Sequence, residues 1–299
     1  MKVLNFGSLN IDNVYAVKDI VKEGETVSST SLHVYSGGKG LNQSIALRRA
    51  GIHVMQAGVI GTDGMFLKEL LDEDEVDTRY IQEISNIKTG HAIIQINQEG
   101  ENCILLYAGA NHQITKEYID EVLKDFSKGD VLILQNEISE LSYLIDAAHE
   151  KDMIIFFNPS PIDDTIFEIN LSHVNYLLLN EHEAKAIVKQ DEIDVEESVE
   201  IIKGMYPNLK ILLTLGKNGS VYYDKDTKIQ QSAYPVKAVD TTGAGDTYTG
   251  YFIAGILRGL SIQETMVLAS KASAIAVTKK GAAPSIPKYE EVASFGINY

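Results

Sequence analysis

A short stretch around residue 244 combines small residues with a carboxylate in a pattern suited to phosphate chemistry. Gly243, Ala244 and Gly245 carry almost no side chain, so another molecule can come close to their backbone N–H groups. The stretch leads into a helical pattern, and the N–H groups at a helix N-terminus form a ready-made phosphate site. Asp246 follows in the first turn, where its carboxylate can reach a substrate hydroxyl beside the phosphate. A helix cap and a tight turn are the alternative explanation of these residues.

A second glycine-rich stretch precedes a helical pattern that runs to Gly51. Its sequence is Ser36-Gly37-Gly38-Lys39-Gly40-Leu41-Asn42-Gln43. The glycines again allow close approach to the backbone, and the Asn42 amide offers both a donor and an acceptor. Gly40 follows Lys39 where a Walker loop needs Ser or Thr, and the chain holds no clean Gly-x-Gly-x-x-Gly. The pattern therefore favours neither a Walker loop nor a dinucleotide fingerprint.

The elements that position these stretches alternate regularly. We expect strands at Val3–Phe6, Val54–Ile60, Val131–Leu134, Met153–Phe157, Tyr176–Leu179 and Lys210–Thr214. We expect helices near residues 65–71, 117–126, 140–150, 181–189, 195–205, 245–258 and 263–279. Short apolar strands between helices predict an α/β fold with a central, mostly parallel sheet covered by helices on both faces. Polar residues follow the carboxyl ends of the strands, which meet at one edge of such a sheet and predict a ligand crevice there.

Two segments outside this alternation predict a second, smaller sheet. Short β-rich pieces lie at residues 14–17, 26–27 and 32–35. Residues 89–96 and 102–107 flank the turn signal Asn97-Gln98-Glu99-Gly100 and predict a hairpin. Both segments leave and rejoin the α/β chain. We therefore expect a single domain over residues 1–299, with a small antiparallel β lid formed by about 14–35 and 88–108.

Composition narrows the class of partner. The net charge of −16 argues against nucleic acid or an anionic membrane as the main partner, although local N–H groups can still bind phosphate. The single cysteine, Cys103, rules out an internal disulfide framework. No Cys-x-x-Cys or His pair with zinc spacing is present. The N-terminus lacks a signal-peptide pattern and no apolar run has the length of a membrane span, so we expect a cytoplasmic protein.

Several motifs together resemble those of the ribokinase-like (PfkB) family of carbohydrate kinases, in the family's order and over nearly the whole chain. The matching segments are Gly7-Ser8-Leu9-Asn10-Ile11-Asp12, Gly37–Gln43, Gly109-Ala110-Asn111, Asn158-Pro159-Ser160-Pro161, Asn180-Glu181-His182-Glu183, Asp240–Thr247 and Val277–Ala282. The resemblance implies the catalytic base at Asp246 and an anion hole at Gly243, Ala244 and Gly245. It implies sugar-binding positions, beside Asp246 itself, at Asn10, Asp12, Gly38, Lys39, Gly40, Asn42 and Glu137.

The same resemblance implies a nucleotide side and a cation site. ATP-binding positions are implied at Asn180, Glu183, Thr214, Gly216, Lys217, Gly219, Gly245 and Ser270. Glu183 belongs to an element that the family ties to magnesium and phosphate. A monovalent-cation site, for K⁺, is implied at Asp240, Thr242, Ala276, Lys279, Gly281 and Ser285. Direct pairing of Asp240 with Lys279, without any ion, is the alternative.

The chain departs from the family pattern at three positions. Leu41 replaces a small alanine, Tyr248 stands where phenylalanine is common, and Lys279 takes a place often held by arginine. None of these changes removes a reacting group. Leu41 is the one that we expect to narrow the sugar pocket.

The resemblance implies an ATP-dependent kinase that phosphorylates the primary hydroxyl of D-ribose, giving ribose 5-phosphate and ADP, with Mg²⁺ and K⁺ as cofactors. It also implies a homodimer formed through the lid. A fructokinase, another sugar kinase or a nucleoside kinase is the alternative within the family. A catalytically silent sugar-binding regulator is disfavoured because Asp246 and its glycines are intact, and an oxidoreductase is disfavoured because the dinucleotide fingerprint is missing.

Overall fold

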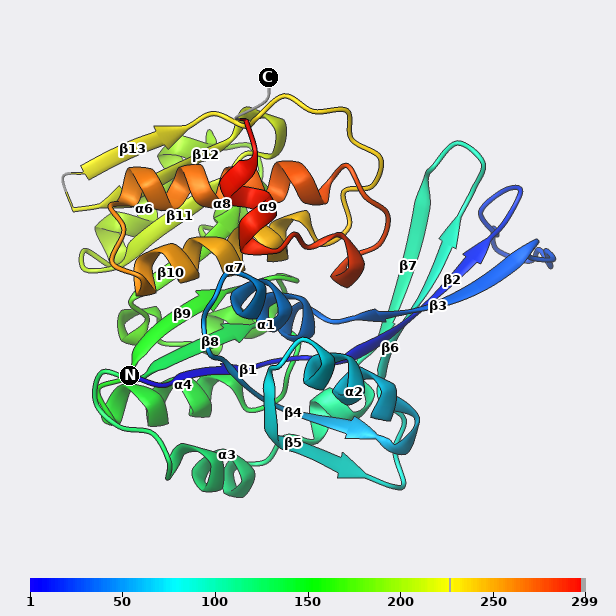
Figure 1. The fold of residues 1–299 in the computed structure, drawn as a ribbon, viewed down its shortest axis with the longest axis horizontal. Coiled ribbons are helices and arrows are strands. Elements are labelled where there is room, and N and C mark those ends of the chain that lie inside the picture. Colours follow the sequence, from blue (N-terminus) through cyan, green and yellow to red (C-terminus); the bar gives the residue numbers. More distant parts are fainter. Residues whose placement is uncertain (226, 297–299) are drawn as a thin grey trace.

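The computed structural model describes residues 1–225 and 227–296, and its centre is a large sheet. The strands of this sheet are β1 (Val3–Phe6), β4 (Met55–Gly61), β5 (Asp77–Ile84), β8 (Val131–Gln135), β9 (Ile154–Asn158), β10 (Tyr176–Asn180), β11 (Lys210–Thr214), β12 (Ser220–Asp224) and β13 (Thr227–Gln231). Their order is β13-β12-β11-β10-β9-β8-β1-β4-β5 (Figure 1). The β11–β12 and β12–β13 pairs are antiparallel, and the other pairs are parallel. The expected mostly parallel sheet is confirmed.

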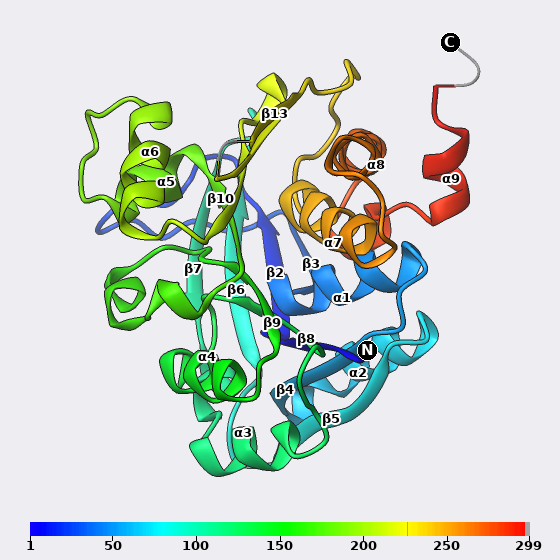
Figure 2. The same ribbon diagram turned by 90° about the vertical axis from the view of Figure 1, so that its left-hand side faces the viewer.

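Helices cover both faces of this sheet, as Figure 2 shows. One face carries α3 (Lys116–Leu123), α4 (Leu141–Glu150), α5 (Glu181–Ile187) and α6 (Val195–Met205). The other face carries α1 (Lys39–Arg49), α2 (Met65–Glu73), α7 (Ala244–Leu257) and α8 (Ile262–Ala276), followed by α9 (Tyr289–Ser294). Within residues 1–225 and 227–296, no helix is both long and apolar enough to cross a membrane.

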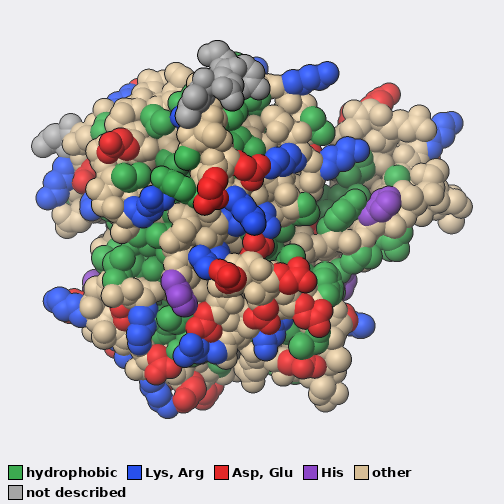
Figure 3. All heavy atoms as spheres, viewed as in Figure 1, with side chains coloured by type: hydrophobic (Ala, Val, Ile, Leu, Met, Phe, Trp, Pro, Cys, Tyr) green, Lys and Arg blue, Asp and Glu red, His purple; other side chains and the backbone are tan. Residues whose placement is uncertain are grey.

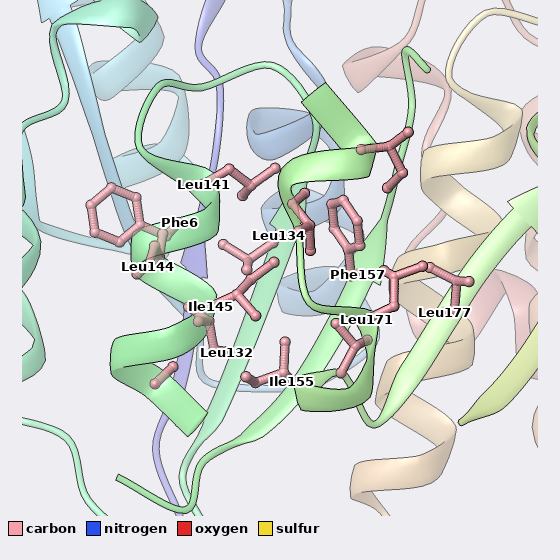
Figure 4. Packing of buried hydrophobic residues seen from close by; sticks show 14 of the residues in the cluster. Phe6, Leu132, Leu134, Leu141, Leu144, Ile145, Ile155, Phe157, Leu171 and Leu177 are labelled. Atoms are coloured by element: carbon pink, nitrogen blue, oxygen red, sulfur yellow. The ribbon is translucent and has the colours of Figure 1, made fainter. Parts of the chain in front are cut away.

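The two faces have separate hydrophobic cores because side chains alternate along each strand. On β8, Leu132 and Leu134 pack toward α4, whereas Val131 and Ile133 belong to the core under α1 and α7. Figure 4 shows the first of these cores, where Phe6, Leu144 and Phe157 gather between the sheet and α4. Burial on both faces fixes the register of the strands, since a shift by one residue would exchange the two cores.

A smaller sheet projects from one edge of this α/β body (Figure 1). Its strands are β2 (Asn10–Ala16), β3 (Ser31–Gly37), β6 (Gly90–Ile96) and β7 (Asn102–Tyr107), in the order β3-β2-β6-β7. The outer pairs are antiparallel, and the central pair, β2 with β6, is parallel. All six residues of β7 are exposed.

The structure differs from the sequence-based expectations at several places. β5, the hairpin of β12 and β13 and the short helix α9 were not predicted, and residues 26–27 form no strand. Asn10 and Asp12 lie in β2. The unpredicted strands lie at the two margins of the large sheet, where polar side chains are tolerated and the apolar pattern is correspondingly weak.

Candidate active site

The N-terminus of α7 points into the crevice at the carboxyl ends of the parallel strands. Gly243 is its N-cap and adopts a left-handed conformation with φ of 74°, which glycine tolerates without strain. A side chain at this position would also press against Ala282. Asp246 lies in the first turn of α7 with 7% of its surface exposed. The glycine therefore turns the chain so that a carboxylate and the first amides of the helix share one site.

The first N–H groups of α7 are not equivalent. The Ala244 N–H donates to the Thr241 carbonyl at 3.2 Å, and the Thr247 N–H donates to the Gly243 carbonyl at 2.8 Å. Within the described part of the chain, the N–H groups of Gly243 and Gly245 have no hydrogen-bond partner. Of the three residues expected to form an anion hole, Ala244 is thus already bonded within its own turn, whereas Gly243 and Gly245 can donate to an anion.

Both oxygens of the Asp246 carboxylate accept hydrogen bonds from α1. Asn42 donates through Nδ2 to Oδ2 at 3.0 Å, and Gln43 donates through Nε2 to Oδ1 at 3.0 Å. The Asn42 Oδ1 atom is buried and has no partner among the described residues. A buried acceptor without a donor costs free energy unless a ligand supplies one. Asn42 is therefore suited to accept a hydrogen bond from a substrate hydroxyl.

Carboxylates from two further elements lie on the side of Asp246 that faces the small sheet. Glu137, just after β8, accepts hydrogen bonds from the Ser8 hydroxyl and, at 3.0 Å, from the Lys39 backbone N–H. Asp12 on β2 lies close enough to Glu137 and Asp246 for the charges of both to raise its pKa. The Asn10 side chain accepts a hydrogen bond from Asn111 at 2.7 Å. This side of the site thus offers several hydrogen-bond acceptors, which suits a ligand with many hydroxyl groups.

The electrostatics of the site are governed by four carboxylates, those of Asp12, Glu137, Glu183 and Asp246, and by the ammonium of Lys39. Desolvation, and then the charges of Glu137 and Asp246, raise the pKa of Asp12 from 3.8 to about 6. Burial by itself would lower the pKa of Lys39, but the charges of Asp246, Glu137 and Glu183 raise it overall. Lys39 therefore keeps its positive charge, and its ammonium can neutralise an anionic ligand.

Two adjoining cavities lie on the other side of Asp246. The first, of about 240 Å³, is lined by Lys39, Asn158, Asn180, Glu183, Thr214, Thr241, Gly243, Gly245 and Asp246. The second, of about 520 Å³, is lined by Thr214, Gly216, Lys217, Gly219, Tyr234, Val236, Thr241, Gly245, Ser270 and Val277, among others. Thr214, Thr241 and Gly245 line both cavities. Together they form a space with a charged end at Asp246 and a larger, more apolar end.

Asn180 and Glu183 form a capping box at the start of α5. The Asn180 side chain accepts from the Glu183 N–H at 2.9 Å, and the Glu183 carboxylate accepts from the Asn180 backbone and side-chain nitrogens, also at 2.9 Å. Glu183 is 3% exposed and lines the first cavity. Within residues 1–225 and 227–296, no cluster of three or more His, Cys, Asp or Glu side chains has the geometry of a metal site.

The residues expected to hold a monovalent cation come from two loops that meet. The Asp240 carboxylate accepts from the Gly281 N–H at 2.9 Å and from the Thr242 N–H and hydroxyl at 2.9 and 2.7 Å. Burial opposes ionisation of Asp240, but these bonds and the charge of Lys280 lower its pKa overall. Lys279 pairs with Glu291 at 2.8 Å, so the alternative pairing of Asp240 with Lys279 is wrong.

The remaining members of this predicted set take part in backbone turns. The Ala276 carbonyl accepts from the Lys279 N–H at 3.0 Å, and the buried Ser285 hydroxyl donates to the Ala282 carbonyl at 2.7 Å. Lys279 contributes its backbone to this loop while its ammonium is held by Glu291. Among the six predicted cation-site residues, Asp240 directs its charged group into the contact between the two loops, whereas Lys279 directs its ammonium to Glu291.

One expected effect on substrate binding is wrong, and one contributor was missed. Leu41 was expected to narrow the sugar pocket, but its side chain is fully buried in the core under α1 and α7. Gln43 belongs to the glycine-rich motif, but the sequence predicts no role for it. In the structure its side chain donates a hydrogen bond to Asp246. Its helical position next to Asn42 is the only sign of this in the sequence, because the contact spans 203 residues.

Comparison with known proteins agrees with this site. A family model described as pfkB family carbohydrate kinase matches residues 1–289. A curated ribokinase of Bacillus subtilis is 33% identical over 290 residues, which are 96% of this chain and 96% of that protein. The crystal structure of ribokinase from Cryptococcus neoformans var. grubii serotype A in complex with ADP is similar with a TM-score of 0.87 and 32% identity, covering 98% of this chain and 99% of that one.

A third similarity concerns a protein solved with two ligands. The structure of Arabidopsis thaliana ribokinase complexed with ribose and ATP has a TM-score of 0.86 and 27% identity to this chain, covering 98% of this chain and 97% of that one. The family match extends over almost the entire sequence and includes every residue of the site described above. The chain therefore belongs to the pfkB family of carbohydrate kinases.

Proposed function

We propose that the protein is an ATP-dependent kinase that transfers a phosphoryl group to the primary hydroxyl of D-ribose, giving ribose 5-phosphate and ADP. The observation that carries this proposal is the position of Asp246. Its carboxylate lies between a face rich in hydrogen-bond acceptors and a cavity into which the free N–H groups of Gly243 and Gly245 point. The relatives named ribokinase, one of them solved with ribose and ATP, support ribose as the acceptor.

Asp246 is proposed as the group that receives the proton. The ribose hydroxyl oxygen forms a bond to the γ-phosphorus, the bond from that phosphorus to the ADP oxygen breaks, and the hydroxyl proton passes to the Asp246 carboxylate. Asn10, Asp12, Asn42 and Glu137 are proposed to hold the other hydroxyls of the sugar. Gly38 and Gly40 support this arrangement, since a side chain at either position would collide with the backbone near Ser8.

The transferred phosphoryl group carries negative charge that the site can stabilise. The N–H groups of Gly243 and Gly245 form the proposed anion hole, together with the positive end of the α7 dipole. The Lys39 ammonium lines the same cavity and supplies a full positive charge. The larger cavity is proposed to take the nucleoside of ATP, with Gly216, Lys217, Gly219 and Ser270 along its wall.

Magnesium fits this site as a companion of ATP. Both oxygens of Glu183 already accept hydrogen bonds from Asn180, which leaves this carboxylate suited to water-mediated contact. When bound, the ion would neutralise charge on the phosphates. The oxygen-rich loop around Asp240 likewise fits a weakly hydrated monovalent cation such as K⁺, proposed at Asp240, Thr242, Ala276, Lys279, Gly281 and Ser285. An ion there would fix the backbone that leads into Gly243.

The small sheet is proposed to act as a lid over the sugar and as a dimer interface. Asp12 belongs to this sheet and also faces Glu137, so the sheet already contributes to the site. Its strands expose large apolar side chains, among them Leu32, Val34, Ile104, Leu105 and Leu106, each 48–65% exposed. Figure 3 shows apolar side chains along this projection. A second copy of the chain would bury that surface, which a monomer leaves in water.

The test is a panel of acceptors assayed with Mg-ATP. Ribose is expected to have the highest kcat/KM, ahead of fructose and adenosine by at least about tenfold, with ribose 5-phosphate identified by phosphorus NMR. A tenfold preference for fructose or adenosine would favour the alternative of a fructokinase or nucleoside kinase. Sugar binding without turnover of any acceptor would favour a regulator. The proposed use of ATP also favours the cytoplasm as its compartment.

A further inference from the structure

A row of buried amide side chains lies directly beneath Asp246. Asn5 comes from the middle of β1, Gln135 ends β8, and Gln43 lies in the first half of α1. All three side chains are fully buried between the large sheet and α1. Buried amides in an otherwise apolar core are costly unless every one is well hydrogen-bonded. Their placement therefore calls for a reason other than the stability of the core.

The hydrogen bonds fix which way each amide faces. The Gly40 carbonyl can only accept, so the Asn5 nitrogen faces it at 2.7 Å, and the Asn5 oxygen faces Gln135. Gln135 must then present its nitrogen, which donates to Asn5 at 3.0 Å and to the Gln43 oxygen at 2.7 Å. With its oxygen committed in this way, Gln43 must direct its nitrogen away from Gln135.

Asn158 fixes the same orientation independently. The Asn158 nitrogen donates to the Leu178 carbonyl at 2.9 Å, so the Asn158 oxygen faces Gln43 and accepts from its nitrogen at 3.3 Å. The second N–H of Gln43 points to Asp246 Oδ1 at 3.0 Å. Backbone carbonyls on two different elements thus determine that Asp246 meets a donor at this oxygen.

We propose that Gln43 is a positioning residue that holds the Asp246 carboxylate in the orientation needed to accept the substrate proton, with Gln135 and Asn5 holding Gln43. This inference rests on the proposed kinase reaction. Asn42 binds the other carboxylate oxygen, but its amide can rotate because its own oxygen has no protein partner. The Gln43 amide is held by Gln135 and Asn158 and cannot rotate, so its hydrogen bond fixes the orientation of the Asp246 carboxylate.

The need for such a restraint follows from the charge beside Asp246. The Lys39 ammonium lines the same cavity and attracts the carboxylate toward the proposed phosphate position. A carboxylate drawn to Lys39 would turn its free lone pair away from the sugar hydroxyl. Small errors of orientation at a reacting group lower the rate strongly while leaving substrate binding almost intact.

The test replaces Gln43 with methionine, which keeps the length and volume of the side chain but donates no hydrogen bond. For Gln43→Met, kcat should fall about 10- to 100-fold, the range for loss of a hydrogen bond to a charged group. KM for ribose and for ATP should change little. A fall in kcat with unchanged KM is the result that a purely structural role of Gln43 would not give.

Gln135→Met tests the same idea without touching Asp246. It should lower kcat by a smaller factor, about 3- to 10-fold, because Gln43 then becomes free to rotate. Gln56→Met is the matched control: Gln56 is equally buried, bonds Ser44 and the carbonyls of Gly7 and Ala57, and hydrogen-bonds neither Gln43 nor Gln135. Its link to the row runs through Ser44, which accepts from the Asn5 nitrogen at 2.8 Å, and that nitrogen keeps its bond to Gly40 in the variant. This control should lower the melting temperature and keep kcat.

The inference is overturned if folded Gln43→Met keeps the wild-type kcat, or if its loss of activity matches that of Gln56→Met at equal loss of stability. Should Gln43→Met not fold, an unchanged kcat in Gln135→Met overturns the inference instead. Failure of the proposed function gives a different result, since the wild-type protein would then phosphorylate none of the acceptors in the panel.

Discussion

The two sides of the crevice around Asp246 are built from different materials. Toward the small sheet, the site contains Asn42 and Glu137, which are hydrogen-bonded to Asp246 or to neighbouring backbone, and Asp12, which lies near the charges of Glu137 and Asp246. Toward the larger cavity, the walls are mostly glycines, small residues and apolar surface, with Lys217, Tyr234 and Tyr248 as the larger members. The side toward the small sheet would bind a ligand mainly through hydrogen bonds, and the side toward the larger cavity mainly through van der Waals contact.

This difference teaches where the protein is sensitive to change. A side chain held by buried partners cannot be exchanged without leaving a donor or acceptor unpaired, and that costs free energy in every state of the protein. A wall made of backbone and apolar contacts distributes its binding over many weak interactions. We therefore expect large effects from single substitutions on the sugar-facing side and small ones on the nucleotide-facing side.

The largest effect is expected for Asp246→Asn. Asparagine keeps the shape of the side chain but cannot accept the proton, so turnover should fall by roughly 10² to 10⁴. Folding should be preserved, because Asn42 can rotate its amide to meet the new nitrogen. Ribose affinity measured by titration calorimetry should remain close to that of the wild type. Turnover near the wild-type rate in the purified variant would show that Asp246 has only a structural role, through its bonds to Asn42 and Gln43.

Asp12→Asn is expected to weaken ribose binding and to stabilise the free protein. Loss of a charged acceptor should raise KM for ribose by about 10- to 100-fold. The folded-state pKa of about 6 lies above 3.8, so the folded protein binds more protons between these values and loses stability as pH rises. Removing the charge should therefore increase the free energy of unfolding at pH 7.5 by about 1–3 kcal/mol.

Two measurements check this prediction. Denaturant unfolding at pH 7.5 compares the stabilities of the two proteins, and the gain for Asp12→Asn should shrink toward pH 4, where both proteins carry an uncharged side chain. In the wild type, KM for ribose should rise as pH falls below about 6, as Asp12 becomes protonated. A variant that is less stable than the wild type at pH 7.5 would contradict the proposed electrostatic strain at Asp12.

Exchange of the monovalent cation should have a moderate effect on activity, because the proposed cation site lies next to the anion hole that both substrates share. Asp240 and Gly281 are hydrogen-bonded just before the amides at Gly243, and neither residue lines the two cavities. Activity should therefore fall several-fold when K⁺ is replaced by tetramethylammonium at fixed ionic strength, because the larger ion cannot fit between backbone carbonyls. Unchanged kcat and KM in that exchange would remove the cation from the mechanism and leave Asp240 as a structural cap.

The smallest effect is expected on the nucleotide-facing side. Ser270 lines the larger cavity, and its hydroxyl donates to the Ser232 carbonyl at 3.3 Å, a long hydrogen bond. Ser270→Ala should change KM for ATP by no more than about threefold and leave kcat unaltered. Initial rates at varied ATP and saturating ribose measure both quantities. A loss as large as that of Asp12→Asn would abolish the distinction between the two sides.

Much of the fold could be predicted from the sequence because local patterns decide it. The alternation of apolar strands and helices from Val131 to Thr214 matches the observed elements to within a few residues at their ends. These strands are buried on both faces, so their apolar runs are unbroken and easy to detect. β5 and the hairpin of β12 and β13 were missed because strands at the margins of the sheet carry mixed side chains.

For the site, the sequence by itself determined the chemical groups that occur together along the chain. Gly243, Gly245 and Asp246 are adjacent, so the geometry of a helix N-terminus is enough to place them together. Asn180 and Glu183 likewise form their capping box within one helical turn. In these cases the backbone conformation of a few residues fixes the relation between the functional atoms.

Only the tertiary structure decided how these groups meet the rest of the chain. Asp246 and Asn42 are 204 residues apart, and Ser8 and Glu137 are 129 apart. The burial of Leu41 away from the pocket, the raised pKa of Asp12 and the contact of Gln43 with Asp246 depend equally on such long-range packing. No local pattern encodes them, because electrostatic and hydrogen-bond energies depend on distances through space, which only the folded chain establishes.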